Sequence, residues 1–471
     1  MNARSDRQVA DVRFIFDEAA RLTGLDFGDI PRDDMMTDTL PHPNGVGGMM
    51  IGRAAMDRVW RLAEEAGGQA RLARRVEPEK LRRAIGKELV RRFVNERRPL
   101  SGREVDRALS SAGRALRRET GDTRHLIPCH LMRAKDPAQI VLGPVRFMNR
   151  KTTRRRLLEL LRQRRAQVQV GEDDDIDRQM LSEAVTYYRH FGWVAEVEIK
   201  GCDEETSQRL AERAVTSALD CLHLMLGAQW TDRMQIGGPA MRFDRRAALR
   251  VSGTDSLEYS LSSSGFGQVN FPDGWSKRLH TSDHQLLIEL FGAALEAAVD
   301  PDLDRPVSRR VLDAAQWFGE AARDSSEATR VVKYVTALER MLMTEERDDI
   351  SSTISLRLAS LSFENKADFE TWVKRTRDVY DLRSRLVHGS ISPASPDVRR
   401  GVALAARMSE AGVINTLSAF GVASLRETGV SRKRLAHWFN AWVEAALSHV
   451  AAETPANKAT ESAEVRKTTS D

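Results

Sequence analysis

The chain has 471 residues, of which 41% are hydrophobic and 30% charged, and its formal net charge is +5. Such a length exceeds one compact domain and predicts two or three. No run of eighteen apolar residues occurs, and the N-terminal segment lacks the apolar stretch of a signal peptide. We therefore expect a water-soluble, cytoplasmic protein with no membrane partner.

Cysteine usage bears on redox compartment and metal binding. The three cysteines, Cys129, Cys202 and Cys221, fit a reducing compartment and form no C-x-x-C pair. Cys129 with His130, and Cys221 with His223, resemble halves of a metal site, but no second pair stands at a suitable spacing. The sequence therefore predicts no metal and no other cofactor.

Residues 1–122 are predicted to form a helical N-terminal region with basic helices. Apolar residues recur at helical spacing over 6–25. Further helices are expected over 54–66, 78–97 and 102–118. Ser101 and Glu104 have the spacing of a capping box. The Pro- and Gly-rich segment 36–52 predicts a loop.

Positive charge is concentrated in one part of the chain. Residues 51–170 carry 31 Lys and Arg against 13 Asp and Glu. A basic block in a nearly neutral chain can bind an anionic partner such as nucleic acid, but arginine-rich helices are also common as solvated faces. Both interpretations stay open at this point.

Residues 123–280 are predicted to form a mixed α+β domain. The segments 124–132 and 138–148 are β-branched and apolar, which predicts a hairpin or two neighbouring strands. A basic helix (151–166), an acidic connector (171–177), a strand (192–201), a helix (204–226) and short alternating pieces (239–272) are expected to follow.

Residues 281–452 show helical periodicity and no strand signal. Helices are expected over 283–298, 307–322, 325–343, 350–362, 366–387, 396–427 and 431–451. The last segment, 453–471, has almost no large apolar residue and predicts a disordered tail. The predicted class is α+β, with a mixed α/β N-terminal region followed by an all-α C-terminal helical bundle.

One helix of this bundle, 366–387, combines an apolar stripe with a cation. Its apolar arc is formed by Trp372, Val379, Leu382 and Leu386. Arg383 projects about 40° from Val379 on the same helical wheel. An arginine at that position is costly to desolvate unless it is paired or faces a cleft. Asp381 and Arg385, four residues apart, predict an ordinary surface pair.

The same helix is predicted to end at His388 and Gly389. Glycine is favoured just past a helix end, where the helix dipole stabilises a protonated imidazole. A histidine so placed can exchange protons with a substrate near neutral pH, and an arginine provides a planar cation suited to phosphate. Arg383 and His388 are about 140° apart on an ideal helix. They could converge if the last turn unwinds, or if a two-fold mate contributes its own pair.

The residues Arg383 to His388, "RSRLVH", match the R-x4-6-H signature of HEPN domains. Their surroundings resemble the Apea-like branch of that superfamily, which shows a leucine-rich helix with a glutamate and then a helix with an arginine. Here these are "ALERML" with Glu339 and "ISLRLASL" with Arg357. The resemblance covers roughly residues 300–450, about a third of the chain.

The resemblance implies an all-α bundle that forms a homodimer and a metal-independent endoribonuclease that cleaves RNA through its 2′-hydroxyl. In that picture His388 moves protons, and Arg383 stabilises charge in the transition state. Ser384 would hold the phosphate or orient His388. Glu339 would orient Arg383, whereas Arg357 would be a packing or ion-pair residue. No cofactor is implied.

Related proteins act in prokaryotic anti-phage defence, in abortive infection and as toxins, so the N-terminal region is expected to sense a phage-derived or other protein trigger. RNA would be guided by arginines of the basic helix: Arg154, Arg155, Arg156, Arg162, Arg164 and Arg165. The alternative is a non-catalytic HEPN dimerisation protein with an N-terminal sensing or binding domain. A DNA-binding regulator is disfavoured, because no helix-turn-helix with a polar recognition face is evident.

Overall fold

The computed structural model describes residues 3–26, 30, 34, 39–132, 136–167, 175–237, 243–251, 257–265, 275–344 and 349–453. It describes the backbone alone for 164–167, 175–178, 180, 243–251 and 257–265. The chain divides into two units, one of Met1–His125 with Glu198–Ala211 and one of Leu126–Val197 with Glu212–Asp471. The predicted tail lies outside the described residues, apart from Glu453.

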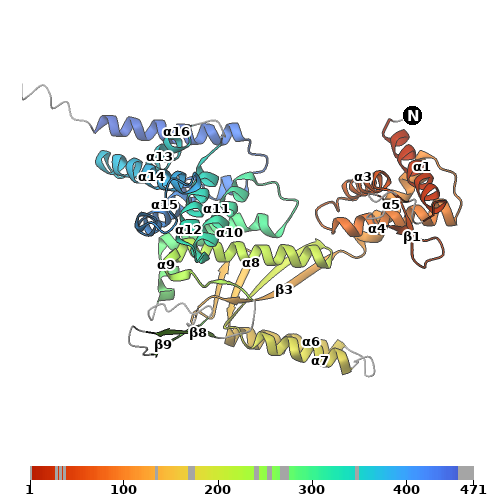
Figure 1. Cartoon of the computed structure of the whole chain (residues 1–471), viewed down its shortest axis with the longest axis horizontal. Helices are drawn as coiled ribbons and strands as arrows, with labels where there is room; N and C mark the ends of the chain where they lie inside the picture. Colours follow the sequence, from red (N-terminus) through yellow and green to blue (C-terminus); the bar gives the residue numbers. More distant parts are fainter. Residues whose placement is uncertain are drawn as a thin grey trace, which may run out of the picture. The chain divides into compact units, whose positions relative to one another are not determined.

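The first unit is mainly helical (Figure 1). Its helices are α1 (Ala3–Thr23), α3 (Arg53–Ala70), α4 (Pro78–Leu89) with its π-helical continuation η2 (Val90–Asn95), and α5 (Gly102–Arg117). The segment predicted as a loop contains an antiparallel hairpin, β1 (Thr39–Pro41) and β2 (Gly48–Met50). Gly45 and Gly47, both at φ +80°, make its turn, so the same glycines that suggested a loop reverse the chain between two strands.

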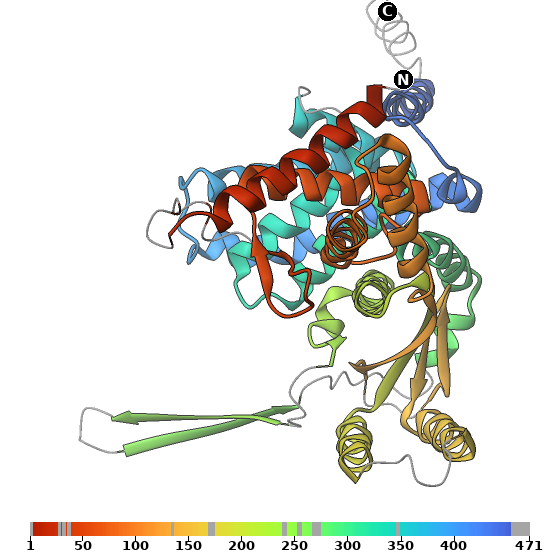
Figure 2. The ribbon, with the colours of Figure 1, turned by 90° about the vertical axis from the view of Figure 1, so that its right-hand side faces the viewer.

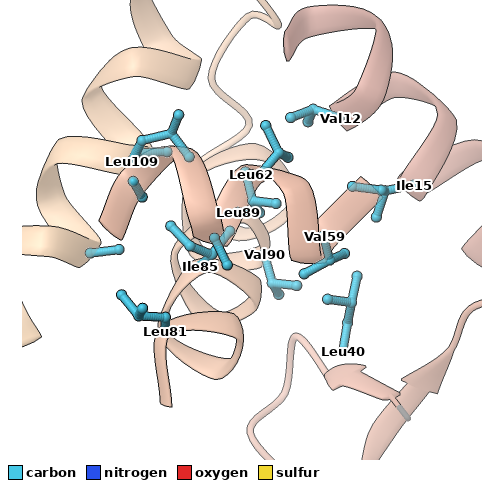
Figure 3. Close-up of a cluster of buried hydrophobic side chains, with 14 of the residues drawn as sticks. Val12, Ile15, Leu40, Val59, Leu62, Leu81, Ile85, Leu89, Val90 and Leu109 are labelled. Atoms are coloured by element: carbon cyan, nitrogen blue, oxygen red, sulfur yellow. The ribbon is translucent and has the colours of Figure 1, made fainter. Parts of the chain in front are cut away.

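Aliphatic side chains from these helices and from β1 form the core of the first unit (Figure 3). Those labelled are at most 4% exposed: Val12, Ile15, Leu40, Val59, Leu62, Leu81, Ile85, Leu89, Val90 and Leu109. Ser101 does precede α5, but its side chain accepts no hydrogen bond from the helix. Glu104 instead pairs with Arg92 and Arg107, so the predicted capping box is wrong.

A five-stranded sheet follows in the chain. Its strands are β3 (Gly121–His130), β4 (Gln139–Leu142), β5 (Val145–Asn149), β6 (Trp193–Cys202) and β7 (Gln235–Ile236), in the order β4-β5-β6-β3-β7. The hairpin in this sheet is formed by β4 and β5, and its turn contains Gly143, whose φ is +55°. β5 and β6 separate β3 from β4, so pairing of the segments 124–132 and 138–148 was a wrong prediction. Sequence proximity favoured that pairing. Instead β6, which begins 44 residues after β5 ends, pairs with β5.

Helices and a second hairpin surround this sheet. They are α6 (Arg150–Gln167), α7 (Asp175–Tyr188), α8 (Glu204–Leu226), α9 (Ala228–Thr231), β8 (Phe243–Val251) with β9 (Leu257–Gly265), and the 3₁₀ turn η3 (Trp275–His280). In Figure 2, α6 and α7 lie on the side of the sheet opposite α8. The Arg156 guanidinium ties α6 to β6 through Glu196, with 3.3 Å between Nη2 and Oε1.

The C-terminal part of the second unit is helical, as predicted. It comprises α10 (Ser282–Val299), α11 (Pro306–Arg323), α12 (Glu327–Leu342), α13 (Ile350–Ser360), α14 (Lys366–Val387), α15 (Pro396–Arg426) and α16 (Arg432–Ala452). N-cap side chains that accept backbone N–H groups start most of them: Ser326, Asp349, Asn365, Ser395 and Ser431. Gly421, at φ +66°, kinks α15. The chain is thus an α+β protein.

Small residues on α15 let its neighbours approach closely. A Cβ on Gly401 would lie 2.2 Å from Leu382 of α14, and one on Gly412 would lie 2.3 Å from Leu338 of α12. These contacts fix α12 and α14 against the same helix. Among the described helices, none is both long and apolar enough to cross a lipid bilayer.

Candidate functional site

The C-terminal end of α14 forms a Schellman motif. His388 is the C-cap, and its N–H bonds to the Ser384 carbonyl at 3.0 Å, as in a regular α-helix. Gly389 follows at φ +71°, and the Ser390 N–H bonds to the Arg385 carbonyl at 2.9 Å. The last turn therefore does not unwind, which removes one of the two ways in which the arginine and the histidine could converge.

Arg383 lies on the face of α14 that meets α12. Its Nη2 is 3.3 Å from Oε2 of Glu339, and the two side chains are 23% and 21% exposed. The Arg383 Nε is buried and has no hydrogen-bond partner among the described residues. The pairing that the resemblance implied for Glu339 is therefore present within one copy of the chain.

Tyr380 lies beside the Arg383–Glu339 pair, and the sequence pattern had indicated no role for this residue. The Arg383 guanidinium carbon lies 5.7 Å from the centroid of the Tyr380 ring. The Tyr380 hydroxyl interacts electrostatically with the Glu339 carboxylate, and burial, followed by this neighbour, raises the pKa of Tyr380. Burial raises the pKa of Glu339, and Arg383 and Tyr380 oppose that rise. Tyr380 and Arg383 are three residues apart, a spacing that predicts contact between side chains on one helix face. This spacing could have indicated the role of Tyr380 from the sequence.

His388 is exposed, whereas Ser384 is half-buried. Among the described residues, no partner is found for the His388 ring or for the Ser384 hydroxyl. Because α14 is regular to its end, Arg383 and His388 leave it about 140° apart. In a single copy, the paired guanidinium of Arg383 and the imidazole of His388, which has no described partner, therefore lie on different sides of the end of α14.

Comparisons with known proteins give this site no precedent. No family model matches the chain, and neither a curated protein nor a solved structure matches it. The HEPN resemblance therefore stays a prediction from the residues. What the site can do has to be inferred from the geometry of α12 and α14.

The arginines predicted to guide RNA lie on α6. Arg154, Arg155 and Arg162 are exposed. Arg156 is half-buried in its pairs with Glu196 and Glu159. The side chains of Arg164 and Arg165 lie outside the described residues. In the first unit, basic residues of α4 and η2 are paired with glutamates of their own helices: Arg82 and Arg83 with Glu79, and Arg91 and Arg92 with Glu88.

Two buried arginines hold the C-terminal end of α12, which carries Glu339. Arg310 donates to the carbonyls of Arg340 (2.8 Å) and Met343 (2.6 Å), and Arg357 donates to Leu342 (2.6 Å). Burial, followed by the neighbouring arginines, lowers the pKa of Arg310 to about 10. Cations suit the negative end of a helix dipole. Arg357 is thus a structural residue that steadies the helix supporting the site.

A polar cluster is buried between α8 and α11. The Arg323 Nη1 lies 2.7 Å from Asp220 Oδ1 and 2.9 Å from His223 Nε2. Burial and the Arg323 charge lower the pKa of His223 to about 3, so its ring is neutral and accepts from the guanidinium. Thr231 lies 2.6 Å from His223 Nδ1. The His223 ring is thus tied into the packing of these helices.

Metal ligands and grooves do not single out another site. Among the described residues, no group of three His, Cys, Asp or Glu side chains is placed to hold a metal ion. All three cysteines are buried and unpaired in disulfides. A groove of about 480 Å³ adjoins β4 and α10, and one of about 400 Å³ adjoins α13 and α16. Neither is lined by Arg383 or His388.

Proposed function

We propose that the protein is a metal-independent endoribonuclease whose reacting groups are Arg383 and His388. The observation that carries the proposal is the end of α14, where Glu339 and Tyr380 hold a half-buried guanidinium and His388 at the C-cap position exposes its imidazole. A fixed cation and a free proton carrier suit phosphodiester transesterification, because RNA supplies its own nucleophile.

In the proposed reaction, the RNA 2′-oxygen bonds to the adjacent phosphorus and the P–O5′ bond breaks. The proton of the 2′-hydroxyl leaves to a base, and a proton reaches the departing 5′-oxygen. His388 carries these protons, since an imidazole can act as both a general base and a general acid. Arg383 stabilises the negative charge on the phosphorane-like transition state. The products are a 2′,3′-cyclic phosphate and a 5′-hydroxyl end.

The proposed site is shared by two copies of the chain. Within one copy the two side chains diverge by about 140°. A two-fold axis beside the ends of two α14 helices would place His388 of one copy near Arg383 of the other in a single cleft. Ser384, which lies between them in the sequence, would then contact the bound phosphate. The homodimer is accordingly part of the proposal.

RNA would also contact basic side chains of α6. The exposed Arg154, Arg155 and Arg162 are suited to phosphate contacts that carry no sequence information. We propose that the first unit senses a phage-derived or other protein trigger. The biological setting is then cytoplasmic anti-phage defence in a prokaryote, or a toxin.

A direct test uses full-length protein and end-labelled single-stranded RNA in EDTA. Wild type is expected to leave cyclic phosphate ends and to spare RNA with 2′-deoxy substitutions. Arg383→Ala and His388→Ala should each slow cleavage by about 100-fold or more. Arg385→Ala is the matched control, since Arg385 is on the same helix and pairs with Asp381 at the surface, with Nη1 and Oδ2 3.7 Å apart.

A mixture of the two inactive variants tests the shared cleft. If one chain supplies the arginine and the other the histidine, mixed dimers regain cleavage that neither variant shows alone. No recovery in the mixture, together with an active wild type, would contradict the shared cleft. Loss of wild-type cleavage in EDTA would contradict the metal-independent mechanism.

A non-catalytic interaction protein is the second candidate, and one observation favours it. Glu339 already pairs with Arg383 within one copy, as it would for a purely structural arginine. In that case dimers form, RNA stays intact during phage challenge as well as at rest, and Arg383→Ala relieves no growth arrest. Intact RNA in triggered cells would replace the nuclease proposal with this one.

A further inference from the structure

We propose that Tyr380 is a positioning residue of the candidate site, which holds the Arg383 guanidinium through Glu339 and through its own ring. The inference rests on the proposed function, because it concerns the cation of that reaction. Neither the apolar pattern of α14 nor the HEPN resemblance assigned Tyr380 a role.

The three side chains form a closed triangle. Tyr380 precedes Arg383 by three residues, which places both on one side of α14. The guanidinium carbon is 5.7 Å from the ring centroid, within the range of a cation–π contact. Glu339 of α12 accepts from Arg383 Nη2 at 3.3 Å and interacts electrostatically with the Tyr380 hydroxyl.

Arg383 needs this additional restraint. Its contact with Glu339 is a single long hydrogen bond, and its Nε is buried with no described partner. One such bond leaves a long side chain free to pivot, whereas a bidentate contact would fix its plane. The Tyr380 ring under the guanidinium restricts that pivot. The outer N–H groups of the guanidinium are then directed consistently toward a phosphate.

The charges around Tyr380 keep it a donor. Glu339 faces it from α12, Asp349 from the N-cap of α13, and Arg383 from α14 itself. Burial and then Glu339 raise the pKa of Tyr380, so the phenol stays protonated at physiological pH. A protonated phenol can donate to Glu339 and so keep that carboxylate turned toward Arg383. Loss of the hydroxyl would leave Glu339 with Arg383 as its sole partner in this triangle.

Two substitutions separate the hydroxyl from the ring. Tyr380→Phe keeps the ring and should lower kcat about fivefold, the order expected for one hydrogen bond to a charged group. Tyr380→Leu removes both contacts and should lower kcat about 50-fold. KM should change by less than about twofold, because the restrained cation acts in the transition state. Tyr334→Phe, a buried tyrosine of α12, is the matched control and should leave kcat unchanged.

A second measurement needs no cleavage. In protein labelled with ¹⁵N at arginine Nε, the buried Arg383 Nε–H should give a resolved, slowly exchanging signal, assigned by its loss in Arg383→Lys. That signal should broaden or disappear in Tyr380→Leu and persist in Tyr334→Phe. The Tyr380 pKa should fall in Glu339→Gln, since the neighbouring carboxylate helps to raise it.

The outcomes separate the inference from the proposed function. An active wild type with unchanged kcat in Tyr380→Phe and Tyr380→Leu, or an Arg383 signal unaffected by Tyr380→Leu, would overturn the inference alone. A wild type that never cleaves RNA overturns the proposed function, and the positioning role falls with it even if the NMR signals behave as expected. Graded loss of kcat at constant KM, with loss of the Nε–H signal, supports both.

Discussion

Arg83 and Arg91 in the first unit differ from Arg383 and Arg323 in the helical bundle in where they find their partners. Arg83 pairs with Glu79 and Arg91 with Glu88, four and three residues away in the sequence. In the bundle, Arg383 reaches Glu339 over 44 residues, and Arg323 reaches Asp220 over 103 residues. The first kind braces one helix, and the second ties separate helices together.

The difference shows how a charge in a sequence should be interpreted. An arginine with a glutamate one turn away can be satisfied at the surface, and it contributes little to stability. An arginine in an apolar arc has no such local partner, so its desolvation must be offset by a group elsewhere in the chain. An arginine in an apolar arc without a local partner is therefore the stronger indication of a functional residue or of a contact between helices.

The largest expected effect is at the most distant of these pairs. Arg323→Ala leaves Asp220, whose side chain is 1% exposed, without its partner. At pH 8 the free energy of unfolding should fall by about 4 kcal/mol, the usual cost of orphaning a buried charge. Urea denaturation measures it. A loss below about 1 kcal/mol would mean that arginines paired with distant residues are no more important for stability than arginines paired at the surface.

Glu410 on α15 is an acid of the bundle whose pKa burial alone raises to about 7. In the unfolded chain its pKa is about 4.3, so the folded state binds the proton more tightly. Protonated Glu410 therefore contributes to the free energy of unfolding. This contribution is fully present below pH about 4 and is lost as pH rises through 7. Glu410→Gln should therefore stabilise the protein by about 1 kcal/mol at pH 8 and hardly at pH 4. Equal effects of Glu410→Gln at both pH values would contradict this prediction. Glu370→Gln, at an exposed residue, is the control.

The smallest effect is expected in the first unit. Arg83→Ala removes an exposed i, i+4 partner of Glu79, and the free energy of unfolding should fall by only about 0.3 kcal/mol. The loss should vanish in 1 M salt, because exposed pairs are screened. A loss above about 2 kcal/mol would show that sequence distance does not separate the two kinds of arginine.

Local signals in the sequence were sufficient for several elements. The helix predicted over 366–387 is α14 residue for residue, and the one over 204–226 is α8. Asp381 and Arg385 form the predicted pair, with Nη1 and Oδ2 3.7 Å apart. Apolar periodicity and N-cap residues act within a few residues of the chain, which is why they can be read without a structure.

Other features could not be predicted in this way. Pairing of the segments 124–132 and 138–148 was wrong, because strand order depends on which segments return to the sheet later in the chain. The capping of α12 by Arg310 and Arg357 was not foreseen either. Both depend on the packing of whole helices and strands, and no short spacing in the sequence encodes that packing.

The sequence by itself determined the run of C-terminal helices and placed an arginine and a histidine at the end of one of them. It did so because helix periodicity, caps and terminal glycines are short-range properties. Only the tertiary structure decided that α14 stays regular through His388 and that Arg383 pairs with Glu339 of α12. Contacts between helices depend on how their faces pack, so the arrangement that restrains Arg383 exists only in the folded chain.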